Sequence, residues 1–339
     1  MMIALTGGGT GGHLSIVNSL LQSASKQNLE CIYIGSENGQ DKKWFENQIL
    51  FKAQYFLNST GVVNQNKLGK IRALSHILKL AFECKKIFKN HKIKAVFSVG
   101  GYSAAPASFG AILANIPLFI HEQNSKKGSL NTLLKPFSKI FFSAFEENFC
   151  PYPVDEKFFQ NARTRDKLET IIFLGGSQGA NFINKLALEL APILHQNKIK
   201  IIHQCGKNDL EFCKKNYKNL DIEADVFDFS KNLESKMQKA DLAVSRAGAS
   251  TLFELCANEL PSIFIPYPYA TKNHQFFNAK FLEDKNLCKI FTEKDFNKAL
   301  FLESIFKLDL KFISQNLKGQ VSPNAADFML KRLKEVVKL

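Results

Sequence analysis

The chain carries the same short pattern twice, once near its start and once near its middle. Residues 3–6 form an apolar run that leads into the glycine-rich stretch 7–12 and then into a helical pattern. Residues 171–174 lead into the glycines of 175–179 and a helical pattern in the same way. A buried strand, a glycine turn and a helix N-terminus open a doubly wound α/β domain. We therefore expect two similar α/β domains that face each other, and 339 residues are enough for two.

Short apolar runs alternate with helical patterns in both halves, which is typical of parallel strands covered by helices on both faces. Strands are predicted at residues 2–6, 31–34, 95–99, 118–121, 140–143, 170–174, 199–203, 241–245 and 262–266. We place one domain at residues 1–155 and a second at 156–322, with a linker in the region 150–166. Residues 323–339 form an amphipathic pattern, which predicts a C-terminal helix that packs on one domain, with the N-terminal one as an option.

The first glycine-rich turn, residues 7–12, has the composition of an anion-binding loop. Glycines let the backbone approach a phosphate, and the following helix offers free N–H groups at the carboxyl edge of the sheet. The spacing of Gly7, Gly9 and Gly12 is only a weak match to dinucleotide loops, and a tight turn without a ligand is the alternative. A Walker loop is disfavoured because His13 stands where that loop needs Lys.

His13 lies in the first turn of the predicted helix. A neutral imidazole there can take a proton from a hydroxyl group, because its unperturbed pKa is about 6.5 and the helix N-terminus favours the neutral form. An ordinary surface or core histidine is the alternative. Its place beside the glycine turn makes His13 our candidate for a general base.

Two further turns of this kind occur in the second half. Residues 175–180 form a glycine loop in which Ser177 adds a side-chain donor. Residues 245–251 lie between a strand and a helix, and Glu254 follows Ser250 by one helical turn. A carboxylate there suits the paired hydroxyls of a ribose. A helix capping box, with Ser250 or Thr251 at the N-cap, is the alternative, and the two roles are compatible.

Two polar clusters also lie at places where predicted strands end. They are residues 121–124 (H-E-Q-N) and residues 273–275 (N-H-Q) with Asn278. Amide side chains both donate and accept hydrogen bonds, which suits neutral sugar hydroxyls better than phosphate. Either cluster alone is also compatible with an ordinary loop, but three anion-type turns and two amide clusters together favour a binding site.

Composition excludes several classes of protein. The formal net charge is +14, yet only five of the 45 cations are Arg, the residue on which nucleic-acid readers depend, so we expect no nucleic acid partner. The seven cysteines show no C-x-x-C spacing, which favours buried thiols over a disulfide framework or a zinc site. Gly and Pro residues interrupt the uncharged stretch 95–121, so we do not expect it to span a membrane.

Much of the positive charge is concentrated in one segment. Residues 67–94 hold nine cations and one acid, interleaved with apolar residues. This combination suits an anionic membrane surface, and an ordinary solvated helix is the alternative. The membrane patch that we predict consists of Lys67, Lys70, Ile71, Arg72, Leu74 and Lys79.

Taken together, the motifs resemble those of one family. In chain order they are G-G-T-G-G-H (8–13), G-G-Y-S-A-A-P (100–106), H-E-Q-N (121–124), G-G-S-Q-G-A (175–180), S-R-A-G-A-S-T (245–251) with Glu254, and N-H-Q (273–275) with Asn278. The chain thus resembles the MurG family of N-acetylglucosaminyltransferases, which convert lipid I to lipid II in peptidoglycan synthesis. The resemblance extends over residues 2–280, and the ordered set is far more specific than any single motif.

The resemblance implies a GT-B fold, in which two Rossmann-like parallel-sheet domains face each other across a cleft. It also implies an inverting transfer of N-acetylglucosamine from UDP-N-acetylglucosamine to the muramoyl C4 hydroxyl of lipid I, undecaprenyl-pyrophosphoryl-N-acetylmuramoyl-pentapeptide, without metal or cofactor. The N-terminal domain would bind the acceptor and the membrane, and the C-terminal domain would bind the UDP-sugar. The expected location is the cytoplasmic face of the bacterial inner membrane, as a peripheral protein.

The resemblance assigns roles to residues as well, with His13 as the general base, Glu254 on the ribose and the backbone of Ser230 on uracil. The expected donor contacts are Thr10, Gly11, Gly12, Asn124, Ser177, Ser230, Ala249, Ser250, Thr251, Leu252, Phe253, Glu254 and Gln275. The expected acceptor contacts are Gly8, Gly9, Gly100, Gly101, Tyr102 and Ser103.

The chain departs from the family pattern at the linker. The family commonly has N-P-V-R there, and its Arg helps to bind the donor, but this chain has Asp155 in place of that Arg. Arg163, Arg165 and Arg246 are the candidates to supply the missing cation.

Three other functions remain as alternatives. The nearest is another GT-B UDP-sugar enzyme, either a glycosyltransferase or a 2-epimerase. An NAD-dependent oxidoreductase fits less well, because the acid after the second strand, Glu37, lies 25 residues past Gly12 rather than about 20. A non-catalytic membrane adaptor is the third.

Overall fold

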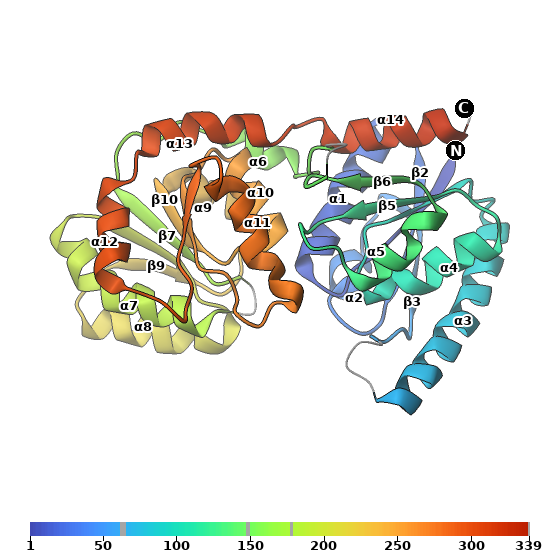
Figure 1. Cartoon of the computed structure of the whole chain (residues 1–339), viewed down its shortest axis with the longest axis horizontal. Helices are drawn as coiled ribbons and strands as arrows, with labels where there is room; N and C mark the ends of the chain where they lie inside the picture. The colour runs from blue at the N-terminus through green and yellow to red at the C-terminus, as the bar shows by residue number, and fades with distance from the viewer. Residues whose placement is uncertain (62–65, 147–149, 177–178, 338–339) are drawn as a thin grey trace. The chain divides into compact units, whose positions relative to one another are not determined.

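The computed structural model describes residues 1–61, 66–146, 150–176 and 179–337 (Figure 1). The chain divides into two compact units. Unit 1 comprises Met1–Asp155 and Pro323–Leu339, and unit 2 comprises Glu156–Ser322. Each unit is built around its own six-stranded sheet.

The sheet of unit 1 is parallel throughout and has the strand order β3-β2-β1-β4-β5-β6. Its strands are β1 (Met2–Thr6), β2 (Glu30–Ser36), β3 (Phe51–Leu57), β4 (Ala95–Ser98), β5 (Leu118–Glu122) and β6 (Ser138–Ser143). The central strands are buried because helices cover them, and Ile32, Val96 and Ile120 pack with Leu80 and Phe88 from a helix into one core.

The helices of unit 1 come from both ends of the chain. They are α1 (Gly11–Lys26), α2 (Asp41–Phe45), α3 (Lys67–Asn90), α4 (Ala105–Leu113), α5 (Ser129–Leu134) and α14 (Ala325–Val337), with the short 3-10 helices η1 (Tyr102–Ala104) and η2 (Lys135–Phe137). The start of α3 is fixed by Asn66, whose side chain accepts a hydrogen bond from Gly69 N. Helix α14 packs against α1, so the last helix of the chain completes the unit that the first strand begins (Figure 1).

The sheet of unit 2 is also parallel and has the order β12-β11-β10-β7-β8-β9. Its strands are β7 (Thr170–Leu174), β8 (Lys200–Gln204), β9 (Ala224–Phe227), β10 (Leu242–Ser245), β11 (Ser262–Phe264) and β12 (Cys288–Ile290). Its helices are α6 (Glu156–Gln160), α7 (Asn181–Gln196), α8 (Leu210–Asn219), α9 (Leu233–Lys239), α10 (Ala249–Ala257), α11 (His274–Glu283), α12 (Lys298–Lys307) and α13 (Leu310–Leu317), with the 3-10 helices η3 (Lys207–Asp209), η4 (Thr271–Asn273) and η5 (Lys318–Gln320). Asn297 and Asp309 cap α12 and α13 with their side chains.

Both sheets reverse their strand order at one place. In unit 1 the reversal lies between β1 and β4, and in unit 2 it lies between β7 and β10. Ligands of doubly wound sheets bind outside the carboxyl ends of the strands at such a switch point. The fold therefore directs attention to four turns, which follow β1, β4, β7 and β10.

The predicted architecture of two doubly wound parallel sheets is confirmed. All nine predicted strands are present, with ends within two residues of those predicted. Three further strands, β3, β9 and β12, were not predicted, and each lies at the edge of a sheet. Among the helices that the structure describes, none is both long enough and apolar enough to cross a membrane.

Candidate active site

The glycine turns after β1 and β4 pack backbone against backbone in unit 1. Gly7, Gly9, Gly100 and Gly101 all have positive φ, between 79° and 127°, which side chains rarely tolerate. The amide of Gly8 donates to the carbonyl of Gly100 at 3.3 Å, and a Cβ at Gly101 would collide with the carbonyl of Gly8. Gly7 and Gly101 are needed because the two turns approach each other too closely there for a side chain, and Gly9 and Gly100 lie against the side chains of Tyr102 and Asn131.

Two amides of the first turn already have acceptors within the protein. Gly8 N donates to Gly100 O, and Gly9 N donates to Oδ2 of Asp41 at 2.6 Å. Helix α1 begins two residues further on, at Gly11, and the first N–H groups of a helix have no acceptor inside it. The amides of Gly11 and Gly12 are therefore those best placed to meet an anion.

His13 is held from two sides. Its Nδ1 lies 2.9 Å from Oγ1 of Thr10, and its Nε2 lies 3.0 Å from Nε2 of Gln123. An amide nitrogen can only donate, so this arrangement makes Nε2 of His13 the acceptor and places the ring proton on Nδ1. The side chain of Thr10 thus orients the imidazole instead of capping α1. A hydroxyl group that replaced the Gln123 amide would meet the basic nitrogen of His13.

The loop that carries Gln123 is fixed by the buried carboxylate of Glu122. Its Oε1 accepts from Asn124 N at 3.0 Å, and its Oε2 accepts from Gly128 N and from Nδ2 of Asn131, each at 2.9 Å. Glu122 is therefore used inside the loop, whereas the side chain of Gln123 reaches His13.

His121 is buried beneath this loop. Its ring lies edge-on to that of Tyr152, with centroids 5.3 Å apart, and neither ring nitrogen has a hydrogen-bond partner among the described residues. Burial, with a further contribution from His13, lowers the pKa of His121 to about 3. His121 is therefore neutral at physiological pH and belongs to the core instead of the ligand-facing surface.

Tyr102 and Ser103 follow the second turn in the 3-10 helix η1. The phenol of Tyr102 donates to the carbonyl of Asn38, and its ring lies against Gly9. Ser103 is fully buried, so its side chain faces the core. Of the predicted acceptor residues, Tyr102 is the one whose side chain borders the first glycine turn.

The glycine loop after β7 forms the corresponding site in unit 2. Ser177, a predicted donor contact, lies outside the described residues, as does Gln178. Gly176 has a φ of 76°, and no atom of the described residues lies within 4 Å of the position of a Cβ, its chain neighbours aside. Gly179 is different, because a Cβ there would press on the carbonyl of Cys205.

The turn after β10 leads into α10 through the N-cap Gly248, which has no side-chain cap. Neither Ser250 nor Thr251 is the N-cap, so the capping-box alternative does not describe this helix. Ser250 Oγ instead donates to Oε1 of Glu254 at 2.8 Å. Leu252 and Phe253, also among the predicted donor contacts, are fully buried, so their side chains face the core of unit 2.

Gln275 ties the turn after β10 to the loop after β11. Its Oε1 accepts from Ala247 N at 3.2 Å and from Tyr267 N at 2.9 Å. Asn278, one turn further along α11, is fully buried and donates to Ala247 O at 3.2 Å. Ser230 lies in the loop after β9, where its Oγ accepts from Asn232 N. These residues, with the turns after β7 and β10, border the carboxyl edge of the unit 2 sheet.

The three arginines proposed to replace the linker cation have different surroundings. Arg165 is fully buried and donates to carbonyl groups, including Met237 O at 3.1 Å. Arg163 pairs with Asp241, just before β10 at the opposite edge of the sheet. Only Arg246 lies at the carboxyl edge, where it pairs with Glu293 at 2.6 Å. Arg246 is therefore the one of the three that is placed to meet a ligand there.

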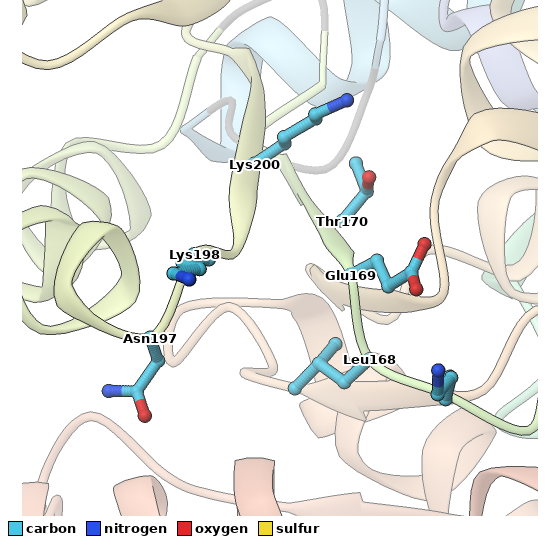
Figure 2. A pocket seen from close by; sticks show the side chains of 7 residues that line it. Leu168, Glu169, Thr170, Asn197, Lys198 and Lys200 are labelled. Carbon is cyan, nitrogen blue, oxygen red and sulfur yellow. The ribbon is translucent and has the colours of Figure 1, made fainter.

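A surface hollow of about 370 Å³ in unit 2 lies elsewhere (Figure 2). It is lined by Lys167, Leu168, Glu169, Thr170, Asn197, Lys198 and Lys200. These residues surround the N-terminal ends of β7 and β8, so the hollow does not belong to the carboxyl-edge site. Among the described residues, no group of three or more His, Cys, Asp or Glu side chains is arranged to hold a metal ion.

One residue and one contact at the unit 1 site were not predicted from the sequence. Asp41 lies in a polar stretch that resembles an exposed loop, and nothing in its spacing indicates that it is buried. Gln123 was identified only as part of an amide cluster. The signal that could have indicated its contact with His13 is the parallel order of β1 and β5, which brings both strand ends to one edge.

Two family descriptions match the chain. Residues 3–142 match the glycosyltransferase family 28 N-terminal domain, and residues 170–334 match the glycosyltransferase family 28 C-terminal domain. With its two Rossmann-like sheets, the chain is therefore a two-domain glycosyltransferase of the GT-B class.

Relatives over the full length define the particular family. A Campylobacter jejuni subsp. doylei protein named UDP-N-acetylglucosamine--N-acetylmuramyl-(pentapeptide) pyrophosphoryl-undecaprenol N-acetylglucosamine transferase is 66% identical over 332 residues, 98% of this chain and 97% of that protein. A Wolinella succinogenes protein of the same name is 50% identical over 331 residues, 97% of this chain and 98% of that protein. A crystal structure of Acinetobacter baumannii MurG has a TM-score of 0.79 at 26% identity, over 98% and 99% of the two chains. This chain belongs to the MurG family of N-acetylglucosamine transferases.

The alternative functions are not favoured by these similarities. The crystal structure of a UDP-GlcNAc 2-epimerase from Neisseria meningitidis, bound to UDP-GlcNAc, matches with a TM-score of 0.67 over 99% of this chain and 100% of that one. Its identity to this chain is only 14%, so the likeness shows a shared fold alone.

Proposed function

We propose that the chain transfers N-acetylglucosamine from UDP-N-acetylglucosamine to the muramoyl C4 hydroxyl of lipid I and so forms lipid II. The strongest support is its similarity, over nearly the whole chain, to relatives that carry this activity in their name. In a single displacement, the acceptor oxygen bonds to the anomeric carbon on the face opposite UDP, and the bond to UDP breaks. The product is a β-1,4 link, and UDP leaves with the electron pair.

The acceptor proton goes to Nε2 of His13 in this mechanism. The geometry supports this assignment because Thr10 lies 2.9 Å from Nδ1 of His13 and the amide of Gln123 donates to Nε2. The negative charge that develops on UDP is stabilised by preorganised amides at helix N-termini.

We assign the donor to the carboxyl edge of unit 2 and the acceptor to that of unit 1. Glu254 would accept from the ribose hydroxyls, and Arg246 would supply the cation that the linker lacks. In unit 1, Gly8 and Gly9 would shape the acceptor site through their lack of side chains, because their amides are engaged within the protein. Thr10, Gly11 and Gly12 stay predicted donor contacts, as the resemblance implies.

The test of this function is transfer of labelled N-acetylglucosamine from the UDP donor to a lipid I analogue. We expect His13→Ala to lower turnover by roughly 10²–10⁴-fold, the usual contribution of a general base. His195→Ala, at the exposed C-terminal end of α7, is the matched control and should keep wild-type turnover. Normal turnover of His13→Ala at saturating acceptor would show that another group is the base.

We also propose that α3 docks the enzyme on the anionic cytoplasmic surface of the inner membrane, where a lipid-linked acceptor lies. Four apolar side chains on α3 are exposed by 50–65%, and their spacing places them on one helical face: Ile71, Leu74, Leu78 and Phe82. Arg72 and Lys79 lie beside this row and are exposed as well. An exposed apolar row beside cations suits insertion between anionic headgroups.

Co-sedimentation with anionic vesicles tests this surface. Since each basic residue near such a membrane contributes about 1 kcal/mol, Arg72→Glu with Lys79→Glu should weaken binding by about 30-fold or more. Lys214→Glu with Lys218→Glu on α8 is the matched control and should bind as the wild type does. Equal binding of the α3 variant and the control would exclude α3 as the docking surface.

A further inference from the structure

Asp41 is a buried carboxylate to which the catalytic scheme above gives no role. It is the first residue of α2 and is fully buried. Its Oδ2 accepts from Gly9 N at 2.6 Å, and its Oδ1 accepts from Ser36 N and from the phenol of Tyr33, each at 3.0 Å. All three partners are donors, which is the environment of an ionised carboxylate. No ion pair of the described residues includes Asp41.

These contacts hold three consecutive glycines of the first turn. Tyr33 is fully buried and also lies 3.0 Å from Gly7 O, so it links Gly7 to the carboxylate. Burial and the Asp41 carboxylate raise the pKa of the Tyr33 phenol, which keeps the donated proton on Tyr33. Gly8 lies directly against Asp41, since a Cβ at that position would collide with the carboxylate. The amide of Gly9 donates to the same carboxylate.

The position of this carboxylate is the one that a phosphate takes in many glycine loops. There, backbone N–H groups between a strand and a helix point at a bound anion. In unit 1 the protein supplies the anion itself, so the turn has an acceptor for Gly9 N whether or not substrate is bound. The two oxygens of Asp41 also tie the turn after β1 to Ser36, the last residue of β2.

Unit 2 lacks this arrangement among its described residues. The acid that follows β8, Asp209, accepts from Nδ2 of Asn184 on α7 at 2.7 Å instead of from the glycine loop. The two glycine loops therefore differ in the part that the structure describes: an internal carboxylate accepts from the first, whereas Asp209 accepts from a helix side chain beside the second.

We propose that Asp41 is a positioning residue for the acceptor. Its carboxylate acts as an internal anion that holds the first glycine turn in one conformation before substrate binds, and it excludes the acceptor diphosphate from the amide of Gly9. The diphosphate is thereby directed to amides further along the turn, at the start of α1. This inference rests on the proposed acceptor role of unit 1.

The test is Asp41→Asn in the full chain, which preserves size but removes the charge and turns one acceptor into a donor facing an N–H group. We expect KM for a lipid I analogue to rise about tenfold or more, the equivalent of one charge-assisted hydrogen bond. The Kd for UDP should stay at the wild-type value. Exchange of the backbone amides of residues 8–12 with deuterium should become faster in the absence of substrate.

Asp241→Asn is the matched control. Asp241 is also buried and accepts from two backbone amides, those of Glu169 and Thr170, but it lies at the opposite edge of the unit 2 sheet. This variant should lower thermal stability without changing KM for the acceptor.

Tyr33→Phe is a milder test, since it removes one donor to Asp41 and keeps the packed ring. It should raise the acceptor KM as Asp41→Asn does, but by less.

Three results separate the possible outcomes. If Asp41→Asn and Tyr33→Phe both retain the wild-type acceptor KM and amide exchange, the positioning role is wrong. If acceptor and donor binding weaken in parallel with a fall in Tm, as in a general loss of structure, the role is also wrong. If the acceptor fails to protect residues 8–13 of the wild type from exchange, the acceptor assignment of unit 1 fails, whereas faster exchange of the ligand-free Asp41→Asn turn still supports the internal anion.

Discussion

His203 is held by a chain of hydrogen bonds that determines which ring nitrogen carries its proton. Asn184 uses its amide nitrogen to donate to Asp209 and to Cys205 O, so its Oδ1 is left to accept from Nε2 of His203 at 3.1 Å. The other ring nitrogen, Nδ1, lies 3.1 Å from the phenol of Tyr217 and accepts its proton. The network fixes the carbonyl of Cys205 beside the second glycine loop.

Stability should therefore depend on pH through this residue. Burial lowers the pKa of His203 from 6.5 to about 4, so between these values the unfolded chain binds a proton that the folded chain does not. The stabilisation is complete above pH 6.5 and is lost as the pH falls towards 4, by about 3 kcal/mol. Urea unfolding of His203→Asn at several pH values should show a correspondingly smaller decline than the wild type.

Tyr217→Phe provides the control for this measurement. It removes the hydrogen bond that Nδ1 of neutral His203 accepts but leaves the imidazole buried. It should therefore lower the free energy of unfolding most above pH 6.5 and keep most of the decline towards pH 4, which burial causes. Equal slopes for His203→Asn and the wild type would contradict the assignment.

At the scale of the element, the docking of α14 on α1 decides which unit the end of the chain belongs to. Asp327 accepts from Ser23 Oγ at 2.5 Å and from Nε2 of Gln27 at 3.1 Å, and Lys334 donates to Oε1 of the same Gln27. Met329, Leu330 and Leu333 are fully buried. The polar contacts align the two helices, and the apolar face supplies most of the stabilisation.

Leu330→Ala should therefore destabilise unit 1 by about 2–5 kcal/mol, because it leaves a cavity under α14. Lys331→Ala, on the exposed side of the same helix, should have almost no effect. Chemical unfolding followed by the fluorescence of Trp44, which lies in unit 1, would measure both changes. A loss below about 1 kcal/mol for Leu330→Ala would show that α14 does not contribute to the core of unit 1.

The elements differ in how far the sequence predicts them. Central strands were predicted because they are covered on both faces and read as continuous apolar runs. The three strands that were missed all contain a charged residue: Lys52 in β3, Asp225 in β9 and Lys289 in β12. An edge strand has one side less covered, so it tolerates charge and can lose the apolar signature. β6 also lies at an edge, but it was predicted because its residues 140–143 (I-F-F-S) carry no charge.

Only part of the candidate site was predicted from the sequence. The glycine turns and His13 stand out because their residue types are unusual at the end of a strand. Asp41 was not predicted, and Gln123 was predicted only as a member of the cluster 121–124, because their contacts span 32 and 110 residues, which no local spacing encodes. Long-range partners of this kind become visible only once the strand order is known.

At the scale of the whole molecule, all seven cysteines are free and buried. Burial raises the pKa of their thiols, to about 12 for Cys31, Cys84 and Cys256, for example, so the reactive thiolate is scarce at neutral pH. The prediction from spacing, that these residues are buried thiols, is confirmed.

The cysteines of the folded protein should therefore react very slowly with a thiol reagent. In the unfolded protein, all seven cysteines should react. Absorbance after addition of the reagent at pH 8, with and without guanidinium chloride, measures both numbers. Addition of a reductant should leave Tm unchanged, since no disulfide is present. Rapid labelling of even one equivalent in the native protein would mean that a cysteine is accessible.

The return of α14 to unit 1 has a consequence for the order in which the protein can fold during synthesis. Unit 2 is one continuous segment, Glu156–Ser322, and all of it has been translated before α14. Unit 1 begins first but lacks the partner of its α1 surface until the ribosome has made residues 325–337. On a translating ribosome, the first half of this chain should thus reach its native state no earlier than the second half, although its synthesis begins first.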